Sequence, residues 1–200
     1  MKIILICLAA ISLVHGKALT TRNIDDDIIE FTTLAVTPQF MEVIYQYLTT
    51  DLEVQSAISY IQTTEFNQVL TAVQALPEYQ EFDDFLQQYG VDFNNVIHPP
   101  IDFNVQKHLT RGVGFDGFLD DLTAALPEPQ LERLFENKIT NSPDFKALYN
   151  AIISPEFQVL LKNLTATKEY QALIQTLEDR GIVITHVIDF GRAFFGVHQL

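Results

Sequence analysis

The feature that most constrains the fold of this chain is an internal repeat with an offset of 91 residues and no gaps. The offset aligns short identical segments and single residues along most of the sequence. Examples are Pro38-Gln39 with Pro129-Gln130, Glu65-Phe66 with Glu156-Phe157, Glu78-Tyr79-Gln80 with Glu169-Tyr170-Gln171, and Gly90 with Gly181. A duplication of this length predicts two copies of one multi-helix unit, which bury their apolar faces against each other or around something else.

Helix boundary signals recur within each copy. Proline follows Ser or Thr at Thr37-Pro38, Ser142-Pro143 and Ser154-Pro155, which is typical of a helix start. Gly90 and Gly181 suit the left-handed residue after a helix end. Between these signals apolar residues recur at i, i+3, i+4 and i+7, the spacing of amphipathic helices. We therefore predict an all-α protein of about 10–12 short helices that form one structural domain.

The beginning of the chain resembles a secretory signal. Ile3 to Val14 carry no charge, and a small residue, Gly16, offers a cleavage site. We predict a signal peptide over 1–16, a first helical repeat over 17–110 and a second over 111–200. The single cysteine, Cys7, would leave with the signal, so the secreted chain would form no disulfide. No later segment is long and apolar enough to span a membrane.

The chain is strongly acidic, with a formal net charge of −14 that becomes −15 if Lys2 is removed with the signal. Such a surface repels nucleic acid, which we exclude as a partner. The acidic pairs and triplets, among them Asp25-Asp26-Asp27 and Asp120-Asp121, fit solvated helix faces or first turns better than a catalytic carboxylate pair.

Other catalytic and cofactor patterns are weak. The stretch from Gly112 to Gly117 matches G-x-G-x-x-G, but a helical segment and not a strand precedes it, so we predict a flexible hinge between the copies. The histidines at 98, 108, 186 and 198 lack zinc-site spacing, and no serine has a nucleophile setting. We expect no metal, no cofactor, no catalytic residue and no enzymatic activity.

The paired halves and the repeated motifs, namely Pro38-Gln39-Phe40, Glu65-Phe66, Glu78-Tyr79-Gln80 and Gly90 with their mates, resemble the insect allergen-related repeat family. This family includes the cockroach group 1 allergen, mosquito midgut microvilli proteins and the nitrile-specifier proteins of butterfly larvae. The resemblance covers residues 24–200. It implies a helical shell in which the two halves enclose one large apolar cavity filled by fatty acids or phospholipids, in place of an ordinary solid core.

With that resemblance, the apolar stripes become candidates for the cavity lining. The residues expected there are Phe40, Val43, Ile44, Leu48, Ile58, Ile61, Phe66, Val69, Leu70, Val73, Phe82, Phe85, Leu86, Val96, Ile97, Phe103, Leu131, Leu134, Phe135, Leu148, Ile152, Phe157, Leu160, Leu161, Leu164, Leu173, Leu177, Val187, Ile188 and Phe194. Arg111, Arg133 and Arg192 are nominal candidates for contacts with a lipid headgroup.

The function expected from the resemblance is that of a secreted, monomeric carrier of the insect midgut lumen or microvillar surface. It would bind fatty acids or phospholipids, exchange them during transient contact with membranes, and perturb membranes through that exchange. One alternative is a detoxification factor of the nitrile-specifier type, and another is a structural microvillar protein without a ligand. Asn163-Leu164-Thr165 matches the N-glycosylation pattern, with a chance match as the alternative.

Overall fold

The computed structural model describes residues 24–91 and 114–197. These residues form eleven helices and no strand, which confirms the all-α prediction. The first half contains α2 (Ile24–Ala35), α3 (Pro38–Thr50), α4 (Leu52–Ile61), α5 (Thr64–Gln74) and α6 (Pro77–Gln87). The second half contains α8 (Gly114–Ala124), α9 (Glu128–Asn141), α10 (Pro143–Ile152), α11 (Pro155–Thr165), α12 (Lys168–Glu178) and α13 (Ile184–Phe194).

Several predictions fall on the remaining residues and therefore lie outside the described part of the chain. They are the signal peptide over 1–16, the seam between 110 and 111, the lining residues Val96, Ile97 and Phe103, the headgroup candidate Arg111, and the histidines at 98, 108 and 198.

The helix starts follow the capping residues of the sequence. The side chain of Thr37 accepts the N–H of Phe40, and those of Ser142 and Ser154 accept the corresponding N–H of their own helices. These bonds satisfy donors that have no partner within the first turn. The predicted left-handed residues are also found, with φ of 82° at Gly90 and 80° at Gly181. Each helix is only 10 to 14 residues long, so its stability depends on packing against other helices.

The predicted hinge from Gly112 to Gly117 is wrong for the residues that the structure describes. Gly114 is buried and begins α8, with a positive φ of 79°. Its N–H donates to Oδ2 of Asp51 at 3.0 Å, and a Cβ there would lie 2.5 Å from a carboxylate oxygen of Glu53. The positive φ favours glycine here, and the bond to Asp51 joins the starts of α4 and α8, which local sequence patterns do not reveal.

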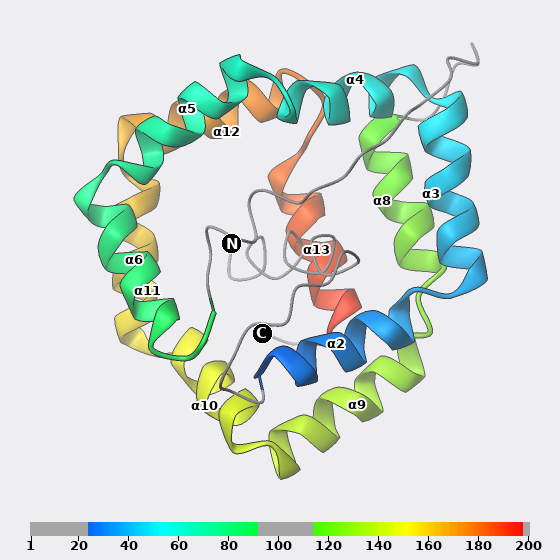
Figure 1. Cartoon of the computed structure of the whole chain (residues 1–200), viewed down its shortest axis with the longest axis vertical. Helices are drawn as coiled ribbons and strands as arrows, with labels where there is room; N and C mark the ends of the chain where they lie inside the picture. Colours follow the sequence, from blue (N-terminus) through cyan, green and yellow to red (C-terminus); the bar gives the residue numbers. More distant parts are fainter. Residues whose placement is uncertain (1–23, 92–113, 198–200) are drawn as a thin grey trace.

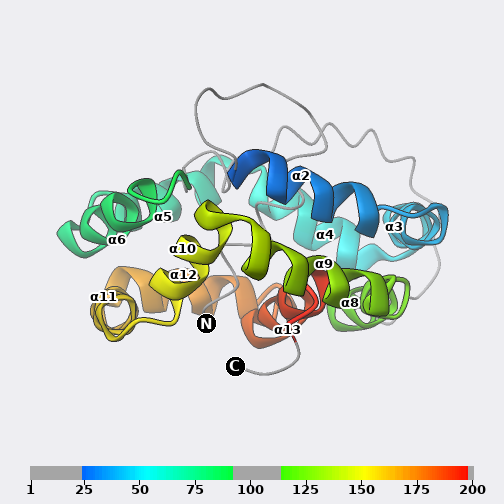
Figure 2. The ribbon, with the colours of Figure 1, turned by 90° about the horizontal axis from the view of Figure 1, so that it is seen from below.

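The two halves lie on each other as two layers. In the view of Figure 1 the helices from α2 to α12 lie around the periphery, and α13 lies inside them. The edge-on view of Figure 2 shows α2 to α6 in one layer, while α8, α9 and α11 to α13 lie in the other. Among the described helices, none is long and apolar enough to cross a membrane.

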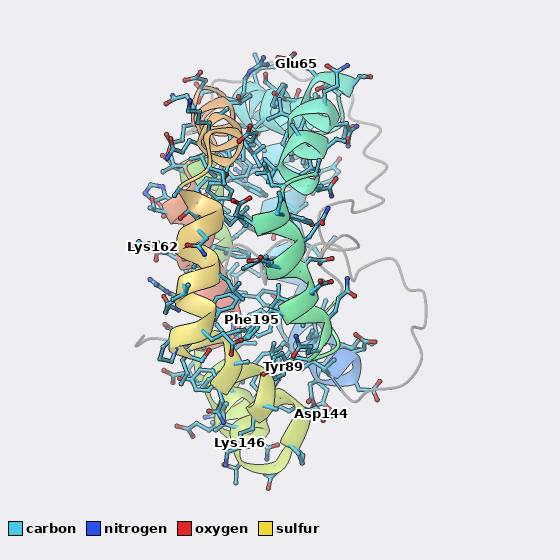
Figure 3. All side chains as sticks on the ribbon, turned by 90° about the vertical axis from the view of Figure 1, so that its left-hand side faces the viewer. Glu65, Tyr89, Asp144, Lys146, Lys162 and Phe195 are labelled. Carbon is cyan, nitrogen blue, oxygen red and sulfur yellow. The ribbon has the colours of Figure 1, made fainter. Side chains whose placement is uncertain are left out.

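The offset of the repeat recurs in the helix bounds and in the contacts. Helices α4, α5 and α6 have counterparts α10, α11 and α12 whose first and last residues are each 91 positions later. The contacts between the halves are therefore related by the repeat. Helix α5 packs against α12, the counterpart of α6, and α6 packs against α11, the counterpart of α5. Likewise, α2 packs against α9 as α3 packs against α8. Figure 3 shows α6 and α11 side by side.

Helix α13 joins the second layer by packing against α8, α9 and α12. Its end approaches α9 so closely that a Cβ on Gly196 would lie 2.5 Å from backbone atoms of Leu131 and Glu132. Gly196 also has a positive φ of 65°, so glycine meets both the steric and the conformational requirement at this position.

Candidate functional site

The residues predicted to line a cavity form the apolar inner faces of the two layers. Three of them, Val96, Ile97 and Phe103, lie outside the described residues, and most of the others are buried. A distinct group packs against the core while it stays only partly buried. This group consists of Val43, Ile44, Ile58, Ile61, Val69, Leu134, Phe135, Leu160, Leu177 and Val187. That these side chains line a cavity stays a prediction.

Aromatic side chains connect the two halves. Phe157 of α11 lies 5.5 Å from Phe82 and 5.7 Å from Phe85 of α6, measured between ring centroids. At the other end, Phe31 of α2 stacks on Phe145 of α10 at 5.5 Å and also contacts Phe195 at 4.9 Å. Ring pairs at these separations stabilise the fold by more than the burial of their surface alone. They therefore help to fix how the two layers face each other.

The inner face of α2 is also part of this interior, although none of its residues was predicted to be. Ile24, Phe31 and Ala35 are almost completely inaccessible, and Ile28 packs against them. The spacing of 24, 28, 31 and 35 is helical, so the signal was available in the sequence. The adjoining acids of the Asp25-Asp26-Asp27 run concealed it.

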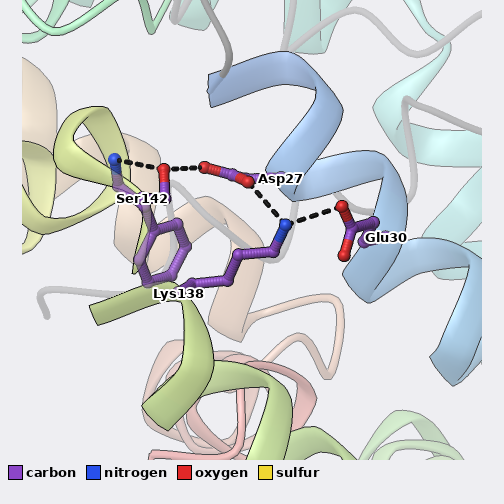
Figure 4. Close-up of polar contacts among 5 residues, drawn as sticks. Asp27, Glu30, Lys138 and Ser142 are labelled. Carbon is purple, nitrogen blue, oxygen red and sulfur yellow. Dashed lines mark hydrogen bonds and ion pairs between the residues drawn. The ribbon is translucent and has the colours of Figure 1, made fainter. Parts of the chain in front are cut away.

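A polar cluster joins α2 to α9 and α10 inside this apolar setting (Figure 4). We call Asp27, Glu30, Lys138 and Ser142 the Lys138 cluster. The Lys138 ammonium lies 2.6 Å from Asp27 Oδ1 and 2.6 Å from a carboxylate oxygen of Glu30. The Ser142 hydroxyl donates to Asp27 Oδ2 and accepts the N–H of Phe145, so it also caps α10. Asp27 and Lys138 are both buried.

Asp25, Asp26 and Asp27 lie in the first turn of α2, which is one of the two placements predicted for them, but the cluster shows that Asp27 is not solvated. Asp27 is only 5% exposed. Burial lowers the pKa of the Lys138 ammonium, and the hydrogen bonds and charges of Asp27 and Glu30 outweigh burial and raise that pKa above its ordinary value. The available signal was Lys138 itself, which falls on the apolar stripe of Leu131 and Leu134, where an ion needs a partner.

The equivalent contact of α3 with α8 uses different groups. The Tyr47 hydroxyl donates to Asp121 Oδ2 at 2.7 Å, and we call this pair the Tyr47 contact. Burial raises the pKa of Tyr47, and the bond to Asp121 raises it further. Nearby, Asp51 is 1% exposed; its Oδ1 accepts the N–H groups of Glu53 and Val54, and its Oδ2 accepts that of Gly114. One carboxylate thus caps helices of both halves.

Other titratable groups are scattered and do not converge. Arg180 lies over the ring of buried Tyr60, 4.2 Å from its centroid, and burial raises the pKa of that tyrosine. Burial also raises the pKa of Tyr170 to about 12. His186 Nδ1 lies 2.7 Å from Asp116 Oδ1 on the surface. Within the described ranges, no group of three or more His, Cys, Asp or Glu side chains is arranged to hold a metal ion.

The remaining predicted site residues lie on or near the surface. Arg133 is exposed on α9, while Arg192 is partly buried on α13 and donates to Asp189 at 3.0 Å. That either residue contacts a lipid headgroup stays a prediction. Asn163 is exposed in the last turn of α11, where a glycan would meet solvent.

The amino-acid sequence is similar to those of known proteins. Residues 23–188 match the model of a family described as insect allergen related repeat, nitrile-specifier detoxification. The chain is also 29% identical over 201 residues to Protein G12 of Anopheles gambiae, a match that covers 95% of each chain. The family match takes in all helices from α2 to α12 and the first turn of α13. The protein therefore belongs to the insect allergen-related repeat family.

Proposed function

We propose that this protein is a secreted, non-enzymatic lipid carrier that holds fatty acids or phospholipids between the apolar faces of its two layers. The observation that carries the proposal is that ten of the predicted lining residues pack against the core and yet stay partly accessible, including Val43, Val69, Leu134 and Leu160. Their remaining accessible surface is apolar and adjoins the buried core, so a guest with an apolar chain could cover it. An acyl chain between the layers would remove their remaining surface from water.

The energetics favour such a guest. An acyl chain of about 16 carbons gains on the order of 10 kcal/mol when it leaves water, at about 0.8 kcal/mol for each buried methylene group. Helices of 10 to 14 residues are marginal alone and gain support from whatever covers their apolar faces. A lipid that binds only the folded protein also raises the free energy of unfolding.

The setting of the proposed function is the insect midgut, with lipids exchanged during transient contact with membranes. Ile3 to Val14 favour export, and membership of the family favours an insect protein. At high concentration, exchange of acyl chains would also disturb membranes. The polar contacts between the halves bind protein to protein, so the guest would be held mainly by apolar contact.

Native mass spectrometry of protein purified from its own source tests this proposal, before and after extraction with organic solvent. We expect stoichiometric fatty acid or phospholipid in the first sample and none in the second. The double variant Val69→Gln and Leu160→Gln changes equivalent positions of the two halves and should lower the lipid content. Val159→Gln is the matched control, because Val159 is exposed and its counterpart in the first half is already Gln68.

Purified protein without stoichiometric lipid, and with a solid interior, would contradict the carrier. The second candidate is a nitrile-specifier detoxification factor, which the description of the family itself favours. Glucosinolate breakdown assayed with and without the protein separates the two functions. A carrier leaves the ratio of nitrile to other products unchanged, whereas a specifier raises it.

A further inference from the structure

The outer surface of the first half carries apolar residues at positions where the second half carries acids. Ile29, Met41 and Tyr45 are 47%, 44% and 71% exposed. The residues 91 positions later are Asp120, Glu132 and Glu136, and all three are exposed as well. Two of the apolar residues, Met41 and Tyr45, are four residues apart on α3 and are therefore neighbours on the helix surface.

The second half shows that the fold does not require apolar residues at the positions of Met41 and Tyr45. Helix α9 occupies the equivalent place to α3 and carries Glu132 and Glu136 at the same exposed positions. The fold therefore accepts carboxylates there, and burial in the core does not account for Met41 and Tyr45. Exposed apolar side chains that adjoin one another, in contrast to ones that are scattered singly, make this face a candidate interaction surface.

The charges of α3 indicate what kind of surface it would meet. Glu42 is the only charged residue in the 13 residues of α3, whereas α9 carries five, namely Glu128, Glu132, Arg133, Glu136 and Lys138. The whole chain has a formal net charge of −14, which disfavours approach to an anionic membrane. Tyrosine and methionine on a helix with a single charged residue suit a neutral, zwitterionic lipid surface, where the tyrosine ring can stay at headgroup level.

We propose that the outer face of α3 docks on zwitterionic membranes and inserts Met41 and Tyr45 among the lipid headgroups. The inference rests on the proposed lipid transfer, for which it supplies the membrane contact. With its 13 residues, α3 lies along the surface and does not span the bilayer. Because the contact is apolar, added salt leaves binding to neutral vesicles unchanged and improves binding to anionic ones by screening repulsion.

The first experiment exchanges the apolar pair for the acids of the second half. Full-length secreted protein and the double variant Met41→Glu with Tyr45→Glu are floated with phosphatidylcholine vesicles. We expect the variant to bind at least about tenfold more weakly, because two large side chains lose their partial burial. We expect the helix content and melting temperature of the variant to stay unchanged, since Glu132 and Glu136 occupy the equivalent positions of α9. Val159→Gln removes an exposed apolar residue of α11 and leaves binding unchanged.

A second measurement uses the absence of tryptophan from the chain. In Tyr45→Trp the new indole is the only one, so its emission shifts to the blue and is quenched by bromolipid when α3 docks. The reverse exchange, Glu132→Met with Glu136→Tyr, gives α9 a similar face and increases vesicle binding.

The inference is overturned if the double glutamate variant binds vesicles as well as the wild type does, or if the emission of Tyr45→Trp does not shift. It is also overturned if sedimentation shows a dimer that only the glutamate variant disrupts, because the face would then bind a second copy. Lipid content distinguishes this failure from failure of the carrier. If the double glutamate variant still contains lipid but no longer binds vesicles, both proposals are supported. If the wild-type protein binds vesicles but contains no lipid, only the carrier proposal is contradicted.

Discussion

The contacts of α2 with α9 and of α3 with α8 are equivalent in the two halves, yet different chemistry holds them. Lys138 replaces Tyr47 and Glu30 replaces Asp121 when the chain is shifted by 91 residues. One contact is therefore an ion pair and the other a hydrogen bond from a neutral hydroxyl. In both contacts a long side chain reaches a carboxylate across the interface. That side chain is charged in Lys138 and neutral in Tyr47.

The two contacts differ in whether the carboxylate that remains after the contact is broken is buried or exposed. Asp27 is buried beside Lys138, so loss of the ammonium leaves a carboxylate without its countercharge inside the protein. Asp121 is exposed, so water can replace the hydroxyl of Tyr47. Breaking the Lys138 cluster should therefore cost more stability than breaking the Tyr47 contact.

Lys138→Met should lower the free energy of unfolding by about 3–5 kcal/mol, because it leaves a buried charge uncompensated. Equilibrium unfolding in urea, followed by circular dichroism, measures the change. The double variant Asp27→Leu with Lys138→Met should recover most of the loss, since apolar residues often replace a buried ion pair at little cost. An unchanged urea midpoint for the single variant would show that the Lys138 cluster does not stabilise the fold.

Alkaline pH should weaken both contacts. The pKa values of Lys138 and Tyr47 are raised in the folded protein above their ordinary values of 10.5 and 10.0. Their contributions to stability are therefore fully present below those ordinary values and are lost as pH rises through the raised ones. Urea midpoints measured between about pH 8 and 12 should fall steeply above about pH 10.

The same pH series separates the two contacts. Lys138→Met and Tyr47→Phe should each remove part of the alkaline loss, and buried Tyr60 and Tyr170, whose pKa values are also raised, account for part of the remainder. Full retention of the alkaline loss in both variants would contradict this assignment.

Tyr47→Phe should cost about 1 kcal/mol at neutral pH, the usual contribution of one hydrogen bond. The ring still packs against Phe118, whose centroid is 5.2 Å away, and solvent covers Asp121. Thermal and urea unfolding should therefore rank Tyr47→Phe well above Lys138→Met in stability. Equal losses in the two variants would remove the asymmetry between the contacts.

Asp25→Asn should produce the smallest change, a slight gain in stability at neutral pH. Burial and then the charge of Asp26 raise the pKa of Asp25, so its ionised form is disfavoured in the folded protein. The stabilising contribution of its proton is present below the ordinary value of 3.8 and is lost above it. The gain in melting temperature should vanish near pH 3, and a loss at neutral pH would contradict this account.

Local patterns predicted the helices well, because capping and periodicity act within a few residues. Thr37, Ser142 and Ser154 cap the helices that the sequence assigned to them, and Gly90 and Gly181 are left-handed as expected. The prediction failed at Gly114, where a carboxylate 63 residues earlier in the chain caps a helix start in place of the hinge.

The sequence did not predict the buried ion pair, because its two partners are distant along the chain. Asp27 was predicted on a solvated helix face or in a first turn, and it does lie in the first turn of α2, but its burial against Lys138, 111 residues further along the chain, was not predicted. The exposed Met41 and Tyr45 became conspicuous only when burial was compared between the two halves. Neither observation follows from composition or spacing alone.

The sequence by itself determined the repeat, the helix starts and the apolar stripes, since each depends on interactions within one helix or on direct comparison of the copies. Only the tertiary structure decided which charges are buried, which glycines permit close contact, and which apolar residues face solvent. The physical reason is that burial and pairing are properties of surfaces from both halves brought together, and the free energy of an ion or an apolar side chain depends on that environment.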